Sequence, residues 1–318
     1  MLVERGHMYI VTGATGHIGN NVVRYLVSLN HEVRVLVRKY DDSLKDLPIE
    51  IKIGDVFTQT FLDESINPGD IVIHCAGFID LMNIEKYQSF RTNYLGTKKI
   101  ADLCLKKNNR LVYISSVDAI PKKKRGLVSE PLELNPKHLK TYYAKSKALA
   151  TDYIMNLMRT GLNAVVLYPS AVIGIHDYKP SAAGREILSV MKHRIVFTLH
   201  GGYNFIDVRD VAKAIVVASS LSIKDHIILS NTDKTIHQLY ISIEKATNTK
   251  KFIIPIPSLI ARLAVIFTSR YSQMMISAIQ DNYHYSNLKM KKYLLPTLIP
   301  FDETIKDTTI WLSSHDKT

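Results

Sequence analysis

Two residues on one predicted helix have the types and spacing needed for acid–base chemistry. Tyr143 and Lys147 stand at i and i+4, so both side chains lie on one helix face and the ammonium can sit beside the phenol. A phenol ordinarily titrates near ~10, and a neighbouring positive charge favours phenolate and lowers that pKa. Tyr143 is therefore the predicted general acid or base. The adjacent Tyr142 has Ser146 at i+4, which supplies no charge, so we interpret it as a substrate-side or packing aromatic.

A pair of hydroxyl groups precedes this helix. Ser115 and Ser116 follow an apolar run that starts at Arg110 and predicts a strand. They would lie at the carboxyl edge of a sheet, where open α/β proteins bind ligands. A hydroxyl there can hydrogen-bond a substrate oxygen on which charge develops. Ser116 is the predicted catalytic hydroxyl and Ser115 the alternative, while caps and turns are the non-catalytic interpretation of both.

Near the start of the chain, an apolar run and three glycines predict a strand, a tight turn and a helix. Met8 to Val11 form the strand, and Gly13, Gly16 and Gly19 follow at the spacing GxxGxxG. Missing side chains allow the main chain to approach a ligand and the helix to pack on the strand. The free amides of the first helical turn then make an anion site, suited to a dinucleotide pyrophosphate. The loop residues expected to bind it are Gly13, Thr15, Gly16, His17, Ile18 and Gly19.

Strand and helix patterns alternate along the first half of the chain. Strands are expected over residues 31–38, 49–53, 70–75, 110–115 and 164–169, with long helices over Asn83 to Lys107 and Pro136 to Thr160. This alternation predicts an α/β fold, a Rossmann-type doubly wound parallel sheet with right-handed crossovers. We expect residues 1–169 to form it, completed by parts of 203–231. Residues 170–318 would mainly form a smaller C-terminal substrate lobe, interleaved with that domain.

The end of the second strand indicates which dinucleotide binds. An NAD enzyme of this fold places an acid there for the ribose hydroxyls, but this chain has Arg38 and Lys39, which suit a 2′-phosphate. NADP(H) is therefore the predicted cofactor. Asp41 and Asp42 lie slightly further along and keep NAD as an alternative. A purely solvated loop is the remaining interpretation of the two basic residues.

The ordered set of TGATGHIG, a serine pair at a strand end and YxxxK followed by SKA resembles the extended short-chain dehydrogenase/reductase family. Within that family, the chain is most similar to the dihydroflavonol reductase and 3β-hydroxysteroid dehydrogenase group. The resemblance covers nearly the whole chain, including Phe205 to Ala212 and the closing helices over 286–312. It implies NADP-dependent reduction of a ketone, aldehyde or CoA thioester to an alcohol, or the reverse reaction.

The resemblance also assigns roles to residues outside the glycine loop. Asn93, in the segment NYLGT, would serve a proton relay and helix geometry, completing a catalytic set with Ser116, Tyr143 and Lys147. The segment Tyr168 to Gly174 would form a loop along the nicotinamide. The further cofactor contacts are expected to be Arg38, Lys39, Asp55, Val56, Ala76, Gly77, Tyr143, Lys147, Tyr168, Pro169, Ser170 and Val172. Turn chemistry is the other interpretation of Asp55.

Two rival functions have weaker support. Nucleotide-sugar epimerases on this fold commonly carry an acid after the second strand, which is missing here. Dehydratases of the group place two acids after the catalytic hydroxyl, whereas Ser116 is followed by Val117 and one acid, Asp118. A regulatory or nucleic-acid-binding protein that senses NADP(H) without turnover is the second rival, and its support is the basic run Lys122 to Arg125, which could contact phosphates. Such runs are usually solvated loops, although this one could also draw an anionic substrate to the site.

Composition limits the remaining possibilities. The 318 residues include 41 basic and 29 acidic side chains, for a formal charge of +12, and 46% are hydrophobic, which indicates a well-packed core. Cys75 and Cys104 are the only cysteines, and no secretory leader precedes the first strand, so a cytoplasmic location is expected. The longest apolar stretch, 252–267, falls short of the ~20 residues that span a bilayer. We expect a small-molecule substrate, no metal, no nucleic-acid or membrane partner, and a homodimer joined through the two long helices.

Overall fold

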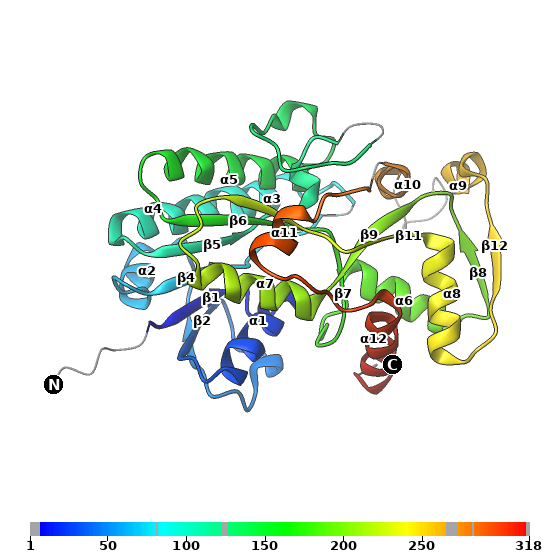
Figure 1. The fold of residues 1–318 in the computed structure, drawn as a ribbon, viewed down its shortest axis with the longest axis horizontal. Coiled ribbons are helices and arrows are strands. Elements are labelled where there is room, and N and C mark those ends of the chain that lie inside the picture. The colour runs from blue at the N-terminus through cyan, green and yellow to red at the C-terminus, as the bar shows by residue number, and fades with distance from the viewer. Residues whose placement is uncertain (1–6, 81, 123–125, 265–272, 282, 316–318) are drawn as a thin grey trace.

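Seven short apolar strands pair into one parallel sheet in the computed structural model, which describes residues 7–80, 82–122, 126–264, 273–281 and 283–315 (Figure 1). The strands are β1 (Tyr9–Thr12), β2 (Val33–Val37), β3 (Glu50–Ile53), β4 (Ile71–His74), β5 (Arg110–Ile114), β6 (Ala164–Pro169) and β10 (His226–Leu229). They lie in the order β10-β6-β5-β4-β1-β2-β3. β2 and β3 thus follow on one side of β1, and β4, β5, β6 and β10 follow on the other side. This is the predicted doubly wound order, with β10 from the 203–231 region as the seventh strand.

Helices cover both faces of this sheet, which explains why its strands are apolar without alternation. Tyr9 and Val11 of β1 face a core shared with α1 (His17–Ser28), α7 (Val208–Ser220) and α11 (Leu288–Tyr293). Ile10 points the other way, because successive strand side chains alternate. It enters a second core, shared with α2 (Gln59–Ser65), α4 (Thr97–Lys107) and α5 (Tyr142–Arg159).

The later segments form a smaller lobe beside the carboxyl edge of the sheet, at the right of Figure 1. It contains a three-stranded sheet, β11-β9-β7, and a two-stranded parallel sheet, β12-β8. The strands are β7 (Ala171–Ile173), β8 (Ile195–Thr198), β9 (Gly202–Asp207), β11 (Thr232–Thr235) and β12 (Phe252–Pro255). The helices are α6 (Ala182–Lys192), α8 (Ile236–Thr247), α9 (Ser258–Ala264), α10 (Gln273–Gln280) and α12 (Phe301–His315). A third core, which includes Ile187, Phe205 and Leu239, fills the lobe.

The helix expected over Asn83 to Lys107 is not uniform. It consists of α3 (Lys86–Ser89), a π-helical turn (Phe90–Gly96) and α4. In the π-helical turn, the hydroxyl of Thr97 donates to the carbonyl of Asn93 over 2.7 Å. This side-chain bond lies at the junction of the π-helical turn and α4.

Two other boundaries also differ from the sequence-based expectation. The helix predicted from Pro136 begins only at Tyr142, because the Thr141 hydroxyl accepts from the amide of Ala144 over 3.0 Å and caps it. Residues Pro136–His138 form a separate 3-10 turn. The segment Tyr168 to Gly174, expected as a loop, instead ends β6 and supplies β7, which pairs with β9.

Close backbone contacts position the glycine loop. Gly13 has φ +72°, and a Cβ there would lie 2.5 Å from the amide nitrogen of Ala76. A Cβ at Gly19 would lie 2.2 Å from the carbonyl oxygen of Gly13. Both distances are too short for a side chain, so the loop, α1 and the end of β4 can pack together only with glycine at these positions.

A buried hydrogen-bond chain joins the glycine loop to the π-helical turn. The amide of Ala76 donates to Thr12 Oγ1 (3.4 Å), which lies 2.7 Å from His74 Nδ1. His74 Nε2 lies 3.0 Å from Thr97 Oγ1. Since the single Thr97 proton goes to Asn93, His74 donates through Nε2. Burial together with the nearby Lys147 charge lowers the pKa of His74 to about 3, so the ring is neutral and its Nδ1 accepts from the Thr12 hydroxyl.

We predict that Gly19→Ala destabilises the protein by about 1–3 kcal/mol, because the new methyl group overpacks against Gly13. The matched control is Gly16→Ala, where the nearest atom to a new Cβ is 3.4 Å away and the cost should stay within about 0.5 kcal/mol. Urea denaturation of the three proteins measures both changes. Equal stabilities for Gly19→Ala and the native protein would contradict the packing argument.

His74 should make the protein acid-labile. In the unfolded chain an imidazole takes up a proton below about pH 6.5, whereas folded His74 stays neutral down to about pH 3. Between these two values the unfolded state binds more protons than the folded state. The free energy of unfolding therefore falls by about 1.4 kcal/mol for each pH unit of acidification, through His74 alone. His74→Asn should remove this slope, and the same change at exposed His200 should not. Unfolding free energies measured from pH 7 to 4 test the difference, and equal slopes would refute it.

Candidate active site

The two serines at the end of β5 face different partners. Ser115 Oγ lies 2.7 Å from Thr151 Oγ1 on α5 and is buried there. Ser116 Oγ accepts from the amide of Asp118 over 3.1 Å and caps the 3-10 turn Val117–Ala119. The Ser116 side chain lies near enough to the phenol of Tyr143 to influence its pKa. The structure thus brings together the hydroxyls of Ser116 and Tyr143 and holds Ser115 inside the fold.

Lys147 lies one turn after Tyr143 on α5 and is almost completely buried. Its Nζ donates to the carbonyl of Ile114 over 2.7 Å and lies 5.0 Å from the centre of the Tyr113 ring. Burial lowers the pKa of Lys147 to about 8. Gly77 is next to this ammonium, since a Cβ there would lie 3.3 Å from Nζ. The cation therefore sits between the ends of β4 and β5.

The phenol of Tyr143 keeps its proton more strongly than the sequence predicts. Burial raises its pKa, the carboxylate of Asp118 adds to this effect, and the nearby Ser116 side chain opposes it. The expected lowering by Lys147 is not seen in the structure, where its ammonium is hydrogen-bonded to Ile114. At neutral pH the site therefore presents a protonated phenol.

Asn93 holds two parts of the site in place. Its Oδ1 accepts from the amide of Phe78 over 2.7 Å, and its Nδ2 donates to the Phe78 carbonyl (2.9 Å) and to Ser146 Oγ (3.0 Å). Ser146 in turn donates to the carbonyl of Tyr143 over 2.8 Å. The amide is thus fully used in tying the segment after β4 to the first turn of α5. These contacts fit the helix-geometry role expected from the sequence.

The glycine loop fits an anionic cofactor. No side chain caps α1 and its first turn contains no acid, so the first amides remain for an anion. The side chains of Thr15 and Ile18 are partly buried, and Gly16 is exposed. Across the sheet edge, Ser170 Oγ is buried and lacks a hydrogen-bond partner among the described residues. A buried hydroxyl without a partner is costly, which suits a ligand that supplies one.

The basic side chains that follow β2 are exposed, as a site for an anion requires. Arg38 and Lys39 are exposed, and no carboxylate in the described part of the chain pairs with Arg38. Asp41 is engaged elsewhere: it accepts from the Ser43 amide (3.1 Å) and pairs with Lys179 (2.5 Å). Burial opposes its ionisation, but the bonds from Lys179 and Ser43 prevail and lower its pKa to about 2. Asp41 is therefore poorly placed to bind ribose hydroxyls.

Several other predicted cofactor contacts have different neighbours. The Tyr168 ring is fully buried in a core of the sheet, so its side chain does not support the predicted contact. His17 Nε2 hydrogen-bonds the carbonyl of Ile175 (3.0 Å), which leaves its main chain for the anion. Asp55 accepts from the Phe57 amide (3.0 Å) and lies 3.6 Å from Arg91, which is turn chemistry.

The remaining members of the predicted cofactor set line the edges of the sheet. Ala76 and Gly77 follow β4 directly beneath the glycine loop, and Val56 follows β3. Pro169 ends β6, and Val172 lies in β7, packed against a core of the sheet. These residues therefore lie at or after the carboxyl ends of strands, where open α/β proteins bind ligands.

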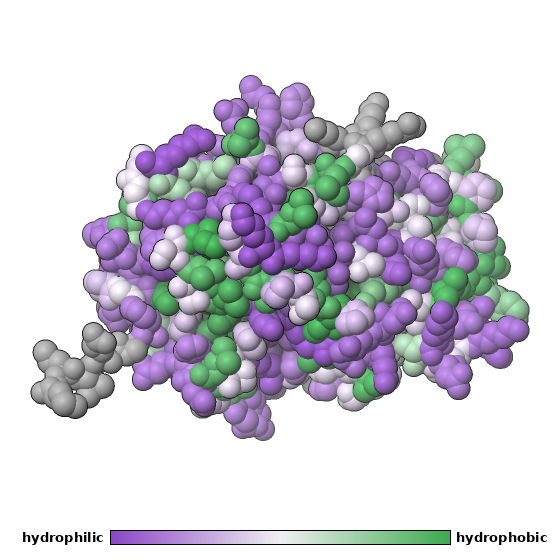
Figure 2. Space-filling model, viewed as in Figure 1, coloured by the Kyte–Doolittle hydropathy of each residue, from purple (hydrophilic) through white to green (hydrophobic). Residues whose placement is uncertain are grey.

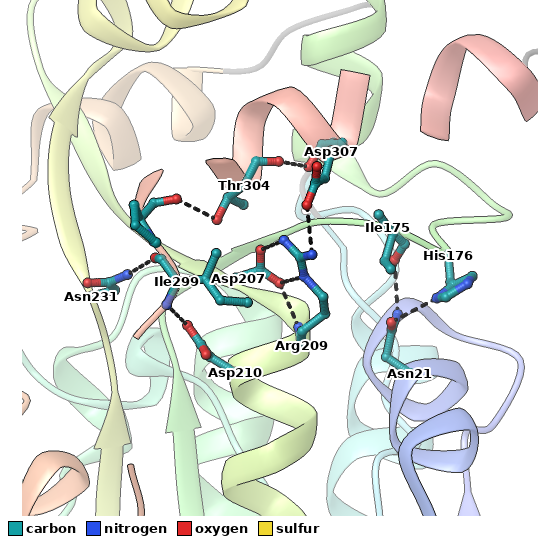
Figure 3. Close-up of polar contacts among 12 residues, drawn as sticks. Asn21, Ile175, His176, Asp207, Arg209, Asp210, Asn231, Ile299, Thr304 and Asp307 are labelled. Carbon is teal, nitrogen blue, oxygen red and sulfur yellow. Dashed lines mark hydrogen bonds and ion pairs between the residues drawn. The ribbon is translucent and has the colours of Figure 1, made fainter. Parts of the chain in front are cut away.

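A polar cluster that the sequence did not indicate joins the lobe to the sheet domain (Figure 3). Arg209 pairs with the buried Asp207 and with Asp307 of α12, both at 2.7 Å. Asn21 of α1 contacts the main chain of Ile175 and the ring of His176, both at 3.0 Å. A cavity of about 600 Å³ lies beside these residues, on α1 and α7 and away from Tyr143. Asp207 and Arg209 belong to the segment 205–212 noted in the sequence, but Asp307 and the partners of Asn21 are remote along the chain, so no local signal indicated those contacts.

The basic run after Ser116 is only partly described. Lys122 pairs with Asp118 at 3.0 Å, and its ammonium lies 5.9 Å from the centre of the Tyr285 ring. Burial opposes its charge, but Asp118 and Tyr285 prevail and raise its pKa. Lys123, Lys124 and Arg125 lie outside the described residues. Lys122 is therefore a structural partner of Asp118 and is not simply solvated.

Comparison with known proteins agrees with this geometry. The model of the NAD dependent epimerase/dehydratase family matches residues 9–227. Sterol demethylase protein B of Methylococcus capsulatus is 28% identical over 253 residues, covering 78% of this chain and 77% of that protein. A putative dihydroflavonol 4-reductase of Synechocystis sp. is 33% identical over 214 residues, covering 66% of this chain and 62% of the relative.

Solved structures show the same fold. The crystal structure of gox2253 superposes with a TM-score of 0.85 at 23% identity, covering 98% of this chain and 100% of that one. At this level of identity the likeness concerns the fold alone. Because the family model spans more than half of the sequence and the sheet has the matching order, this protein belongs to the NAD dependent epimerase/dehydratase family.

Proposed function

We propose that this protein is an NADP(H)-dependent oxidoreductase that reduces a ketone or aldehyde to an alcohol, or a CoA thioester to an aldehyde with release of CoA, or catalyses the reverse reaction. The observation that carries the proposal is the meeting of Ser116 and Tyr143 at the sheet edge, one helical turn from buried Lys147. The name of the Synechocystis relative, a putative dihydroflavonol 4-reductase, agrees with it.

Each residue of the site has a task in reduction. The nicotinamide, when bound, supplies the hydride equivalent. Ser116 donates a hydrogen bond to the substrate oxygen and holds it beside the phenol. Tyr143 gives its proton to that oxygen, and its raised pKa ensures that the proton is present at neutral pH. The Lys147 cation favours the phenolate that remains, since positive charge stabilises it.

The second strand supports NADP over NAD. Arg38 is exposed and lacks a carboxylate partner among the described residues, whereas Asp41 is committed to Ser43 and Lys179. A guanidinium can hold a phosphate through two parallel bonds. These contacts favour a 2′-phosphate at this position.

The second candidate function is a nucleotide-sugar epimerase or dehydratase, which the family description also covers. A dehydratase of this group would need two acids after the hydroxyl, but the chain offers only Asp118, and its carboxylate pairs with Lys122. The free basic residues after β2 also disfavour tightly held NAD. We therefore prefer the reductase.

Replacing Tyr143 with Phe should reduce turnover by about 10²-fold or more, because only the proton-carrying oxygen is lost. NADPH affinity should remain nearly unchanged. The measurement is NADPH consumption with a panel of aromatic, steroidal and CoA-linked carbonyls, together with NADPH binding by fluorescence. Tyr142→Phe is the matched control and should have a mild effect. A larger loss of turnover in Tyr142→Phe than in Tyr143→Phe would mean that the wrong phenol has been assigned. If the native protein turned over none of the carbonyls, the proposed function would be wrong.

Arg38→Asp should weaken NADPH binding by about 2 kcal/mol or more, roughly thirtyfold, by removing a phosphate partner and adding repulsion. NADH affinity should change little. Lys106→Asp makes the same charge change at an exposed position in the last turn of α4 and should leave both affinities unaltered. Titration calorimetry with both dinucleotides distinguishes the cases. A native protein that binds NADH as tightly as NADPH would show that the cofactor assignment is wrong.

A further inference from the structure

The two-stranded sheet β8–β12 at the end of the lobe has an unusual outer face. Its inner face is ordinary: Val196 and Thr198 of β8 are buried, and Ile253 of β12 packs on the lobe core. Alternation then directs the neighbouring side chains outward. On a surface sheet these positions are normally polar, as in most sheets with one solvated face.

Here the outward positions are all large and apolar. Ile195 and Phe197 are each 56% exposed, and Phe252 and Ile254 are 57% and 44% exposed. The pairing register aligns Ile195 with Phe252 and Phe197 with Ile254, so the four side chains form one continuous surface. We call these four residues the β8–β12 face. Contiguous exposed apolar surface of this kind marks an interaction site.

Helix α9, which follows β12 directly, extends the apolar character of this end of the lobe. Leu259 and Ile260 are 71% and 56% exposed. In Figure 2 green residues gather along the right-hand edge of the molecule, where Figure 1 draws β8, β12 and α9. The apolar surface therefore reaches from a strand pair onto the adjoining helix.

Basic residues lie at one end of the face. Lys192 and Arg194 come just before β8, and Lys250 comes just before β12; all three are exposed. Because the two strands are parallel, their amino ends meet, so these cations gather at the same end of the β8–β12 face. Lys251 is different, since its ammonium donates to the carbonyls of Met191 (2.8 Å) and His193 (3.1 Å). The carboxylate of Glu244 accepts from the Lys251 amide (3.1 Å).

We propose that the β8–β12 face docks the substrate lobe reversibly onto an anionic membrane surface. Apolar side chains at the interface and lysine or arginine beside them are the combination that anionic lipid headgroups and the acyl boundary favour. The formal charge of +12 adds attraction at longer range. A second copy of the chain fits less well, because α4 and α5, the helices expected to pair, lie at the other end of the molecule in Figure 1.

This proposal departs from the sequence-based expectation of no membrane partner, which rested on the lack of a spanning segment. Within the described ranges, no helix is long and apolar enough to cross a bilayer. A surface contact requires no span, only an exposed face of suitable chemistry. The β8–β12 face was not apparent in the sequence because its paired residues, such as Ile195 and Phe252, are 57 positions apart.

The test is flotation of the full chain with vesicles of neutral phosphatidylcholine, or of phosphatidylcholine with added phosphatidylglycerol. The native protein should bind the anionic vesicles about tenfold or more tightly than the neutral ones. Higher salt should weaken this binding, since it screens exposed charges. Failure to bind anionic vesicles would overturn the proposal.

Two pairs of substitutions separate the apolar and the charged parts of the contact. Phe197→Ser with Phe252→Ser should cut binding to anionic vesicles about tenfold or more. Arg194→Ser with Lys250→Ser should weaken binding and flatten its salt dependence. Leu132→Ser with Leu288→Ser is the matched control, because these leucines are 87% and 72% exposed outside the β8–β12 face. All six positions are exposed, so melting temperatures should be unchanged and are measured first.

Two outcomes would contradict the assignment. Binding that is equal in the native protein and the double-Phe variant would mean general electrostatic attraction without docking by the β8–β12 face. A halved mass of the double-Phe variant in light scattering, relative to the native protein, would show that a second copy of the chain covers the face. Neither result depends on catalysis, so they are independent of the proposed reductase function.

Discussion

The structure depends on the buried contact between the glycine loop and the end of β4. Gly13 approaches the Ala76 backbone so closely that no side chain fits between them, and Thr12 and His74 join the two strands by hydrogen bonds. Burial and the Lys147 charge keep His74 neutral, so its Nε2 donates to Thr97 and its Nδ1 accepts from Thr12. A buried network that is fully satisfied in only one way specifies one arrangement.

That constraint extends to the chemistry. The same hydrogen bonds end at Asn93, whose carbonyl receives the Thr97 hydroxyl and whose amide binds Phe78 and Ser146. Ser146 contacts the main chain of Tyr143, so the position of the phenol is linked to that of the cofactor loop. The π-helical turn that breaks the long helix is part of this connection, since it is where the Asn93 carbonyl and amide reach their partners.

Burial sets the protonation of the site. It raises the pKa of Tyr143 and lowers that of Lys147, so both groups shift toward their neutral forms before any ligand is considered. The phenol is therefore a ready acid, and the cation is held by the Ile114 carbonyl at the floor of the site. Where the lobe joins the sheet domain, the buried Asp207 pairs with Arg209, which also pairs with Asp307 of α12. Charges inside this protein thus occur with partners that compensate for lost water.

The sequence by itself determined the sheet, its helices and the identity of the residues that meet at its edge. Strand periodicity, the glycine spacing and the i, i+4 relation of Tyr143 and Lys147 each involve residues close together in the sequence. Such patterns can be recognised without the structure. The proposal of NADP over NAD also rests on a local signal, because Arg38 follows β2 directly. Helix limits were less certain, since the Thr141 cap and the π-helical turn depend on side-chain bonds that periodicity does not show.

Only the tertiary structure decided which serine faces Tyr143, that Asp41 is occupied by Lys179, and that Tyr168 is buried. The tertiary structure also places the Lys147 ammonium on the Ile114 carbonyl, and the expected lowering of the Tyr143 pKa by Lys147 is not seen. The exposed β8–β12 face is also a property of the tertiary structure, because its residues become neighbours only when two strands distant in sequence pair. In each case the deciding quantity is burial or a partner remote in sequence. Burial and contacts between residues remote in sequence both result from packing, and packing cannot be inferred from the order of residues along the chain.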